Sequence, residues 1–361
     1  MNIYIKMLAS LFAVLSLLSC ENQELEFDDF EEQTIYFPNK FPIRTLILGE
    51  DRYDNSIDQE HAFTIAANIG GTYNNKEDRV IDFTIDNSLL DTMKLDDSYG
   101  TELRALPSIY YTVTPGDKIT IPAGSFDGRI RIQLNDNFFQ DDSAHLVKYC
   151  VPVILGESTS GKVLSGTKQD WVENPIPTVD GDWAEKPQNY TLFFVNYINE
   201  WHGRFFHRGV QYRNDTVDQR FHERDLVRNQ NSFLKTNAYR SVLCDRVGQF
   251  TKAAGLIQLN FGEPGADGSG LVQVVAPDSS TLTISGGGTY YQSQTDFAKQ
   301  HGSWLVLPDG SVQSHLTIVL DYTVEGGLDS GNPTDNFRLV DTLVYQSNMV
   351  GVEFAKVAVK D

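Results

Sequence analysis

The sequence is poor in cysteine and in basic residues. Its 361 residues include only 3 Cys, and 29 Lys+Arg face 49 Asp+Glu, which gives a formal net charge of −20. So few cysteines exclude a disulfide-dense miniprotein, and a chain of this length can bury hydrophobic cores without cross-links. The negative charge argues against a nucleic-acid partner, because phosphate backbones are bound by clustered Lys and Arg. We therefore expect an acidic globular protein of about two domains.

Long apolar runs are also scarce. The mean hydropathy is −0.31, and the one continuous apolar stretch covers residues 7–18. A run of about a dozen residues is too short to span a bilayer comfortably. It follows Lys6 and ends at Ser19 and Cys20, which is the pattern of a lipoprotein signal peptide. The sequence predicts a signal peptide over residues 1–19 and lipidation of Cys20. The alternative is an ordinary secretory signal with an accidental cysteine at its end.

An acidic segment follows the cysteine. Residues 21–32 hold seven acids and no base, and such a charge run stays extended and solvated. We interpret residues 20–33 as a tether. Acidic residues directly behind a lipidated cysteine resemble the signal that sends lipoproteins of Bacteroidota to the outer face of the outer membrane. The acyl chains would then attach the protein to that membrane, facing the cell exterior.

Residues 34–157 consist of short β-branched and aromatic runs separated by turn residues. Strict alternation over residues 129–134 places Ile130, Ile132 and Leu134 on one face and polar side chains on the other, as in a half-buried antiparallel strand. About eight such candidate strands in this segment predict an immunoglobulin-like β-sandwich.

The same segment resembles a known domain family. The strings that carry the resemblance are IYFP at residues 35–38, RTLILGED at 44–51, DNSID at 54–58, DNSLL at 86–90, and LP at 106–107 with Tyr110 and Tyr111. They are similar to the N-terminal β-sandwich domain of unknown function in Bacteroides lipoproteins from polysaccharide-utilisation loci. In that family the domain precedes varied C-terminal parts, including glycan-binding modules and some endo-N-acetylglucosaminidases. The resemblance covers about residues 30–157 and implies a surface glycan system, with no catalytic residue to carry over.

The composition changes after this domain. Residues 158–188 are rich in Ser, Thr, Gly and Pro, which indicates a linker. Strand patterns resume over residues 189–361, with apparent connections such as Gly286-Gly287-Gly288. Eight or nine consecutive strands favour a calycin-like antiparallel β-barrel, with a second sandwich as the alternative. The predicted fold class is therefore all-β.

Motifs of known chemistry are missing from the sequence. We find no nucleophile elbow, zinc-protease or P-loop string, and the segment after the linker is too short and too strand-rich for a glycosidase barrel. We therefore expect no catalytic residue, cofactor or metal. Residues 329–336 offer oxygen ligands for calcium, but a polar hairpin loop is the simpler interpretation. Cys150 and Cys244 have apolar neighbours and are predicted to be buried free thiols, with a disulfide between them as the alternative.

The most distinctive local feature is an arginine-rich segment over residues 201–228. Its guanidinium groups could grip an acidic glycan, and aromatic side chains could stack on sugar rings. The alternative is that these arginines pair with acids of the protein itself. The ligand-binding candidates are Trp201, Arg204, His207, Arg208, Tyr212, Tyr290, Tyr291 and Trp304.

Together these patterns predict a surface-exposed outer-membrane lipoprotein that binds glycans without catalysis. Its expected partners are an oligosaccharide or polysaccharide, the outer membrane through the lipid anchor, and an outer-membrane transporter complex. One alternative is a structural or adhesin-like surface protein that binds a protein partner. Another is a glycoside hydrolase with an unfamiliar carboxylate pair.

Overall fold

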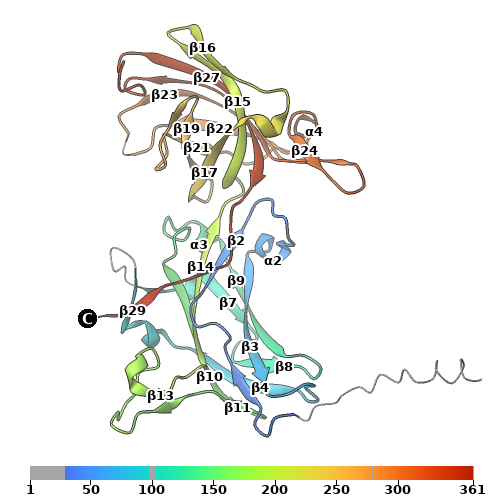
Figure 1. The fold of residues 1–361 in the computed structure, drawn as a ribbon, viewed down its shortest axis with the longest axis vertical. Coiled ribbons are helices and arrows are strands. Elements are labelled where there is room, and N and C mark those ends of the chain that lie inside the picture. Colours follow the sequence, from blue (N-terminus) through green and yellow to red (C-terminus); the bar gives the residue numbers. More distant parts are fainter. Residues whose placement is uncertain (1–28, 97–102, 279, 361) are drawn as a thin grey trace, which may run out of the picture.

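The computed structural model describes residues 29–96, 103–278 and 280–360. The predicted signal peptide, Cys20 and most of the predicted tether lie outside the described residues. The protein is nearly all β, with 49% strand and 8% helix, which confirms the predicted class. Figure 1 shows two bodies stacked along the long axis, a sandwich domain below and a barrel above. No helix in the described parts is long and apolar enough to cross a membrane.

Two sheets build the sandwich domain. Their strands are β1 (Thr34–Tyr36), β2 (Pro42–Ile47), β3 (Ala62–Gly70), β4 (Arg79–Ile85), β6 (Arg104–Ala105), β7 (Tyr111–Thr114), β8 (Lys118–Ile121), β9 (Asp127–Leu134), β10 (Tyr149–Ser158), β11 (Lys162–Val163), β14 (Tyr190–Ile198) and β28 (Glu353–Phe354). The first sheet has the order β11-β1-β3-β9-β7, and the second has the order β28-β2-β14-β10-β4-β8, with β6 beside β10.

The alternation predicted for residues 129–134 is present in β9. Ile130 and Ile132 are fully buried and Leu134 is nearly so, and all three belong to the hydrophobic core of the sandwich domain. Arg129 lies on the opposite face of the strand and is exposed. Burial of each large aliphatic side chain contributes about 1.5–3 kcal/mol relative to exposure, so a strand with this period is held with one face toward the core.

The outer face of the second sheet is also covered. A second hydrophobic cluster there contains Cys150, Leu192 and Phe194, and it packs against η1 (Asn87–Leu90), β5 (Met93–Leu95) and the C-terminal β29 (Val357–Val359). β29 pairs with β5, and β28 pairs with β2. The last described residues of the chain therefore belong to the sandwich domain.

The strand pairing contradicts the prediction that the C-terminal domain begins at residue 189. β14 lies between β2 and β10 in the second sheet of the sandwich domain. Its side chains are buried on both faces, with Phe193 alone partly exposed, as expected of a central strand. A strand's own pattern does not say which sheet it joins, so this run was assigned to the wrong domain. The barrel is an insertion between β14 and β28.

The predicted linker over residues 158–188 does not connect the two domains. It contributes β11 to the first sheet and then forms a hairpin of β12 (Thr167–Lys168) and β13 (Trp183–Glu185). The main-chain N–H of Phe37 donates to the carbonyl of Gln188 at 2.8 Å, which returns the segment to the same domain. Its proline-rich composition reflects turns within the sandwich domain.

Eight strands close the barrel. Its main sheet contains β15 (Gly203–Arg213), β16 (Thr216–Phe221), β17 (Gln230–Ala238), β18 (Ser241–Cys244), β21 (Ile257–Phe261), β22 (Ser269–Val275), β23 (Thr283–Tyr291), β26 (Thr317–Glu325) and β27 (Asn336–Ser347). The order is β16-β15-β17-β18-β21-β22-β23-β26-β27, and the additional pairing of β15 with β27 closes the ring and leaves β16 outside it. This closure decides between the two predicted forms of the C-terminal domain in favour of a barrel.

Smaller elements decorate both domains. The sandwich domain also has α2 (Ser56–Gln59), α3 (Asp136–Phe139), η2 (Ser108–Tyr110) and η3 (Asp180–Asp182). The barrel carries η4 (Leu226–Arg228), β19 (Arg246–Val247), β20 (Phe250–Thr251), α4 (Asp296–His301), β24 (Ser303–Val306) and β25 (Val312–Ser314).

The glycine run predicted as a connection lies inside β23. Gly286 has a φ of +113°, which favours glycine, and a Cβ on Gly288 would overlap the carbonyl oxygen of Val319 on β26. Glycine allows the two backbones to approach here, which is a role for glycine within strands as well as in turns.

Glu50 of the sandwich domain hydrogen-bonds to the end of the barrel that faces this domain. Its carboxylate accepts the N–H of Leu316 at 2.8 Å and lies 2.7 Å from Nδ1 of His315. Its carbonyl accepts the hydroxyl of Tyr345 at 2.7 Å. With the two chain connections after β14 and β27, this makes a third attachment. We call the barrel end facing the sandwich domain the proximal end and the opposite end the distal end.

Candidate functional site

Two of the aromatic candidates are brought together inside the barrel. Trp201 is 1% exposed and stacks on Phe261 at 4.0 Å between ring centroids, and Tyr290 meets it edge-on at 5.4 Å. The guanidinium of Arg240 lies over the Trp201 ring at 5.2 Å. Protein groups thus cover these rings, so neither offers a free face on which a sugar ring could stack.

Two further aromatic candidates lie beside α4 and β24, away from that pair. Tyr291 stacks on Phe297 of α4 at 4.0 Å. Trp304 of β24 packs edge-on against Phe206 at 5.2 Å, and its indole N–H donates to the carbonyl of Tyr345 at 3.0 Å. Both rings are half-buried and hold the α4–β24 segment against the barrel wall.

The polar candidates on β15 are divided between its two faces. Arg204 is exposed, the guanidinium of Arg208 donates to the carbonyl of His301 at 3.4 Å, and Arg338 lies 5.6 Å from the Tyr212 ring. Burial lowers the pKa of Arg208 below its usual value. These residues alternate with His207, which points to the opposite face, so the structure does not gather the candidates into one site.

His207 belongs to a polar network in the barrel interior. Its Nδ1 lies 2.6 Å from the hydroxyl of Ser232, and its Nε2 lies 3.1 Å from Oδ1 of Asp341 without the alignment of a hydrogen bond. Tyr322 donates its hydroxyl to Oδ2 of Asp341 at 3.1 Å. All four residues are at most 2% exposed. The serine, histidine and aspartate resemble a catalytic set, but no substrate reaches groups this deeply buried.

Arg213 supplies the positive charge beside residues 329–336, the loop considered above as a calcium site. Its guanidinium lies 2.9 Å from Asp335 and 3.3 Å from Asp329. Among the residues that the structure describes, no group of three or more His, Cys, Asp or Glu side chains could hold a metal ion. The Arg213 cluster thus fits the interpretation in which arginines of this segment pair with acids of the protein.

Both described cysteines are free and buried, as predicted. Cys150 lies in the sandwich domain and Cys244 in the barrel, and each belongs to a hydrophobic cluster. Burial raises the pKa of Cys150 well above its usual value and that of Cys244 to about 12. Neither thiol is therefore a nucleophile at neutral pH.

A polar cleft lies where the barrel meets the sandwich domain. Two adjoining cavities of about 170 and 220 Å³ share Leu48, Gln59 and Glu200 in their walls. We call them together the interdomain cleft. Further parts of the walls come from the chain connection before β15, the turn between β17 and β18, and the segment after β23. These segments contribute the side chains of Asn199, Trp201, Tyr239, Arg240, Gln292 and Gln294.

Charges in the interdomain cleft are held in place. The guanidinium of Arg240 donates to the carbonyl of Phe261 at 2.9 Å and lies 3.2 Å from Glu263. Burial raises the pKa of Glu200 above its usual value, although the positive charge of Arg240 and a hydrogen bond from Gln292 oppose the rise. A desolvated carboxylate beside a fixed guanidinium is a preorganised pair of hydrogen-bonding groups.

One aromatic side chain of the cleft has an exposed ring. Tyr239 is 37% exposed, and its ring packs against Phe139 at 5.4 Å between centroids, which supports it from the sandwich side. The indole N–H of Trp201, by contrast, is buried and has no acceptor within the described residues. The cleft therefore presents one supported aromatic ring.

Most cleft residues were missed by sequence reasoning. Glu200 directly precedes the candidate Trp201 in the sequence, and this neighbourhood was the one available signal. Tyr239 and Arg240 form a turn, and Gln59 ends a short helix of the other domain. No spacing in the sequence relates these segments, because only the docking of two domains brings them together.

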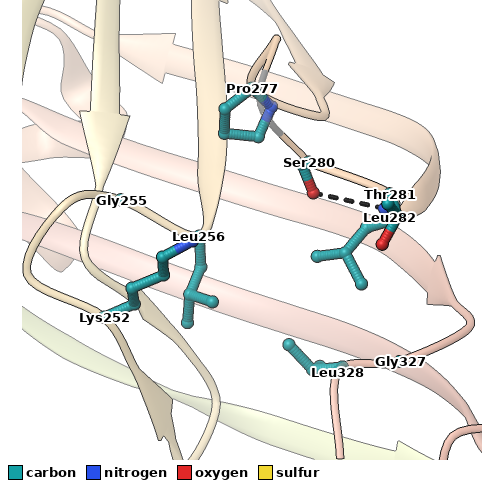
Figure 2. A pocket seen from close by; sticks show the side chains of 9 residues that line it. All are labelled: Lys252, Gly255, Leu256, Pro277, Ser280, Thr281, Leu282, Gly327 and Leu328. Atoms are coloured by element: carbon teal, nitrogen blue, oxygen red, sulfur yellow. Dashed lines mark hydrogen bonds between the residues drawn. The ribbon is translucent and has the colours of Figure 1, made fainter.

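A second cavity, of about 250 Å³, opens at the distal end of the barrel. Figure 2 shows Leu256, Leu282 and Leu328 pointing toward one another from three different loops, with Lys252 and Ser280 beside them. We call it the distal cavity. None of its lining residues was a sequence candidate.

Comparison with known proteins finds similar solved structures from Bacteroides. A family model for an N-terminal domain matches residues 30–162. The chain is similar to a solved structure of unknown function from Bacteroides ovatus, at 29% identity and a TM-score of 0.74, covering 92% of this chain and 100% of that one. A second structure of unknown function from the same organism has 14% identity and a TM-score of 0.42, covering 90% and 100%. No curated protein matches the chain.

These findings agree with the N-terminal domain family to which the sequence is similar. The matched model covers the segment in which the resemblance was found, and it extends slightly beyond the strand β10. The likeness to the first Bacteroides ovatus structure extends over both domains. Two β domains of this kind are therefore shared with a protein of that genus.

Proposed function

We propose that the protein is a lipid-anchored accessory of the bacterial outer membrane that captures oligosaccharide in the interdomain cleft without catalysis. The observation that carries this proposal is the ring of Tyr239, which is 37% exposed on a wall of the cleft, is supported by Phe139, and lines the same part of the cleft as Glu200. An exposed aromatic ring beside fixed hydrogen-bonding groups can stack on the face of a sugar while those groups bind its hydroxyls.

The chemistry of the walls suits a sugar. Gln59, Glu200, Arg240 and Gln292 present planar groups that can hydrogen-bond to neighbouring hydroxyls, and the Tyr239 ring is exposed for stacking. Sugars need this combination because each ring carries hydroxyls at its edge and C–H groups on its face. The cleft is open to solvent along both of its parts, which leaves room for a chain of sugars to extend outward.

The architecture supports display at a surface. The first described residues lie at the end of the sandwich domain away from the barrel, as the start of the coloured ribbon in Figure 1 shows. The main-chain N–H of Phe30 donates to Gly71 at 3.0 Å there. A lipid on Cys20 would therefore place the sandwich domain next to the membrane and the barrel farther out.

A glycan array with residues 20–361, followed by calorimetric titration of the best ligand, tests the proposal. We expect Tyr239→Ala to weaken binding roughly threefold to tenfold, because an aromatic contact contributes about 0.5–1.5 kcal/mol. Trp171→Ala is the matched control, since Trp171 is 78% exposed on the β12–β13 hairpin and far from the cleft in sequence.

Four results would argue against the proposal. Binding to no glycan, or equal loss of affinity in both variants, would remove the cleft as the site. Release of shortened sugars during the titration would contradict the non-catalytic part and favour the hydrolase alternative. Co-purification with an envelope protein in the absence of glycan affinity would favour the adhesin-like alternative.

A further inference from the structure

The distal cavity combines an apolar base with a single positive charge. Leu256, Leu282 and Leu328 are half-buried and pack against the hydrophobic core of the barrel. Their side chains face one another across a gap that protein atoms do not fill, as Figure 2 shows. Apolar surfaces arranged around an open gap favour an aliphatic group over water.

The charge comes from Lys252. This residue is exposed, and Figure 2 shows its side chain running along the cavity toward Leu256. Within the described residues its ammonium group has no carboxylate within ion-pair distance, whereas lysines such as Lys118 and Lys162 are paired. The carboxylate of Asp329, next to Leu328 in the sequence, lies 3.3 Å from Arg213. Lys252 therefore remains available to an anionic group of a ligand.

A hydroxyl lies on the other side of the cavity. The Oγ of Ser280 accepts the main-chain N–H of Leu282 at 3.2 Å, and its own hydrogen remains free to donate. A carboxylate in the cavity would therefore find an ammonium group on one side and a hydroxyl donor on the other. The cavity volume of about 250 Å³ corresponds to about eight waters, which limits an aliphatic tail to a short chain.

We infer that the distal cavity binds a short aliphatic carboxylate, of which octanoate is the simplest probe. Its tail lies on Leu256, Leu282 and Leu328, and its carboxylate pairs with Lys252. The cavity is at the opposite end of the barrel from the interdomain cleft, because its loops follow the distal ends of β20, β22 and β26. The inference is thus independent of glycan binding in the cleft.

Calorimetric titration of residues 20–361 with octanoate and with 1-octanol tests both halves of the inference. We expect octanoate to bind with one-to-one stoichiometry. Lys252→Gln should weaken octanoate binding about threefold to fivefold, as loss of an exposed ion pair implies, and leave octanol binding unchanged. Leu282→Trp should abolish binding of both, because the indole fills the gap. Lys235→Gln, at another exposed lysine of the barrel, is the matched control.

The outcomes separate clearly. No saturable binding of octanoate by the unaltered protein up to about 10 mM would overturn the inference, since weaker affinities are not specific. Equal affinity of the unaltered protein and Leu282→Trp would also overturn it, provided that circular dichroism shows the variant to be folded. An unchanged octanoate affinity in Lys252→Gln would contradict the pairing of the ligand carboxylate with Lys252. Octanoate binding by Tyr239→Ala should be unaffected, so failure here and failure of the cleft are distinguishable.

Discussion

The two domains fill their interiors differently. Between the sheets of the sandwich domain, inward positions of the strands carry aliphatic and aromatic side chains, such as Ile65, Ile130 and Val153. In the barrel, the inward positions of β15, β17 and β27 include His207, Ser232 and Asp341, which are buried among hydrophobic neighbours. The barrel therefore contains a polar network where the sandwich domain has apolar contacts.

This difference shows what closure of a sheet demands. A polar side chain on an inward strand position of a small closed barrel cannot turn to solvent, so it must find a partner among the other inward-facing side chains. His207 finds Ser232 on one neighbouring strand and Asp341 on the other. A buried pair of this kind adds little net stability compared with apolar residues, but removal of one member is strongly destabilising.

The largest expected effect comes from breaking this network. Asp341→Ala removes the partner of both His207 and the Tyr322 hydroxyl. We expect the free energy of unfolding of the barrel to fall by about 3–5 kcal/mol. Ile130→Val in the sandwich core is the comparison, with an expected loss of about 0.5–1.5 kcal/mol. Urea unfolding followed by circular dichroism measures both.

A loss smaller than that of Ile130→Val would show that the Asp341 carboxylate is not needed to balance the interior. The two interiors would then differ in composition but not in how strongly single side chains stabilise them.

An intermediate effect is expected from pH. Nδ1 of His202, at the proximal end of the barrel, accepts the main-chain N–H of Thr236 at 3.0 Å, so that nitrogen must be deprotonated. Burial lowers the pKa of His202 from 6.5 to about 4. The unfolded chain therefore binds a proton between these values that the folded protein excludes. Stability is retained above pH 6.5 and falls by about 3 kcal/mol as the pH decreases to about 4.

Thermal unfolding as a function of pH measures this loss. His202→Gln should be less stable at neutral pH and should lose much less stability between pH 6.5 and 4, whereas His222→Gln, at an exposed position, should follow the unaltered protein. An identical pH profile for His202→Gln would assign the acid sensitivity to another group.

The smallest effect concerns the junction that joins the two domains. Glu50→Ala leaves the buried His315 side chain and the N–H of Leu316 without their partner. We expect a loss of about 1–3 kcal/mol and a separation of the calorimetric unfolding transition into two. Glu60→Ala removes an exposed partner of Arg131 and should cost at most about 1 kcal/mol.

A single unfolding transition at unchanged temperature in Glu50→Ala would mean that the two chain connections alone hold the domains together. It would also mean that the hydrogen bonds of Glu50, which lines one part of the interdomain cleft, do not hold that wall in place.

The sequence predicted local structure where a strand has one buried face. The alternation over residues 129–134 placed Ile130 and Ile132 correctly in a core. Residues 190–198 were correctly predicted to form a strand, but this strand was assigned to the wrong domain, and the glycine run within β23 was predicted to be a connection. A uniformly apolar run does not show which of its faces meets which sheet. Glycine occurs both in turns and at close contacts between strands, so its presence does not distinguish the two.

The candidate site was harder to predict than the fold. Aromatic composition drew attention to Trp201, but the structure places its ring in the barrel core, stacked on Phe261. Tyr239, which has the exposed ring, lies in a turn that carries no distinguishing pattern. Exposure depends on which segments dock against a residue, and those segments come from the other domain.

Side-chain periodicity by itself determined that this protein is all-β and which face of a half-buried strand is apolar, because a period of two is a local property of extended backbone. Tertiary structure alone decided which sheet each strand joined, that β15 meets β27 to close the barrel, and that Gln59, Glu200 and Tyr239 line one cleft. The physical reason is that a strand edge pairs through main-chain groups that every residue shares, so the choice of partner depends on long-range packing.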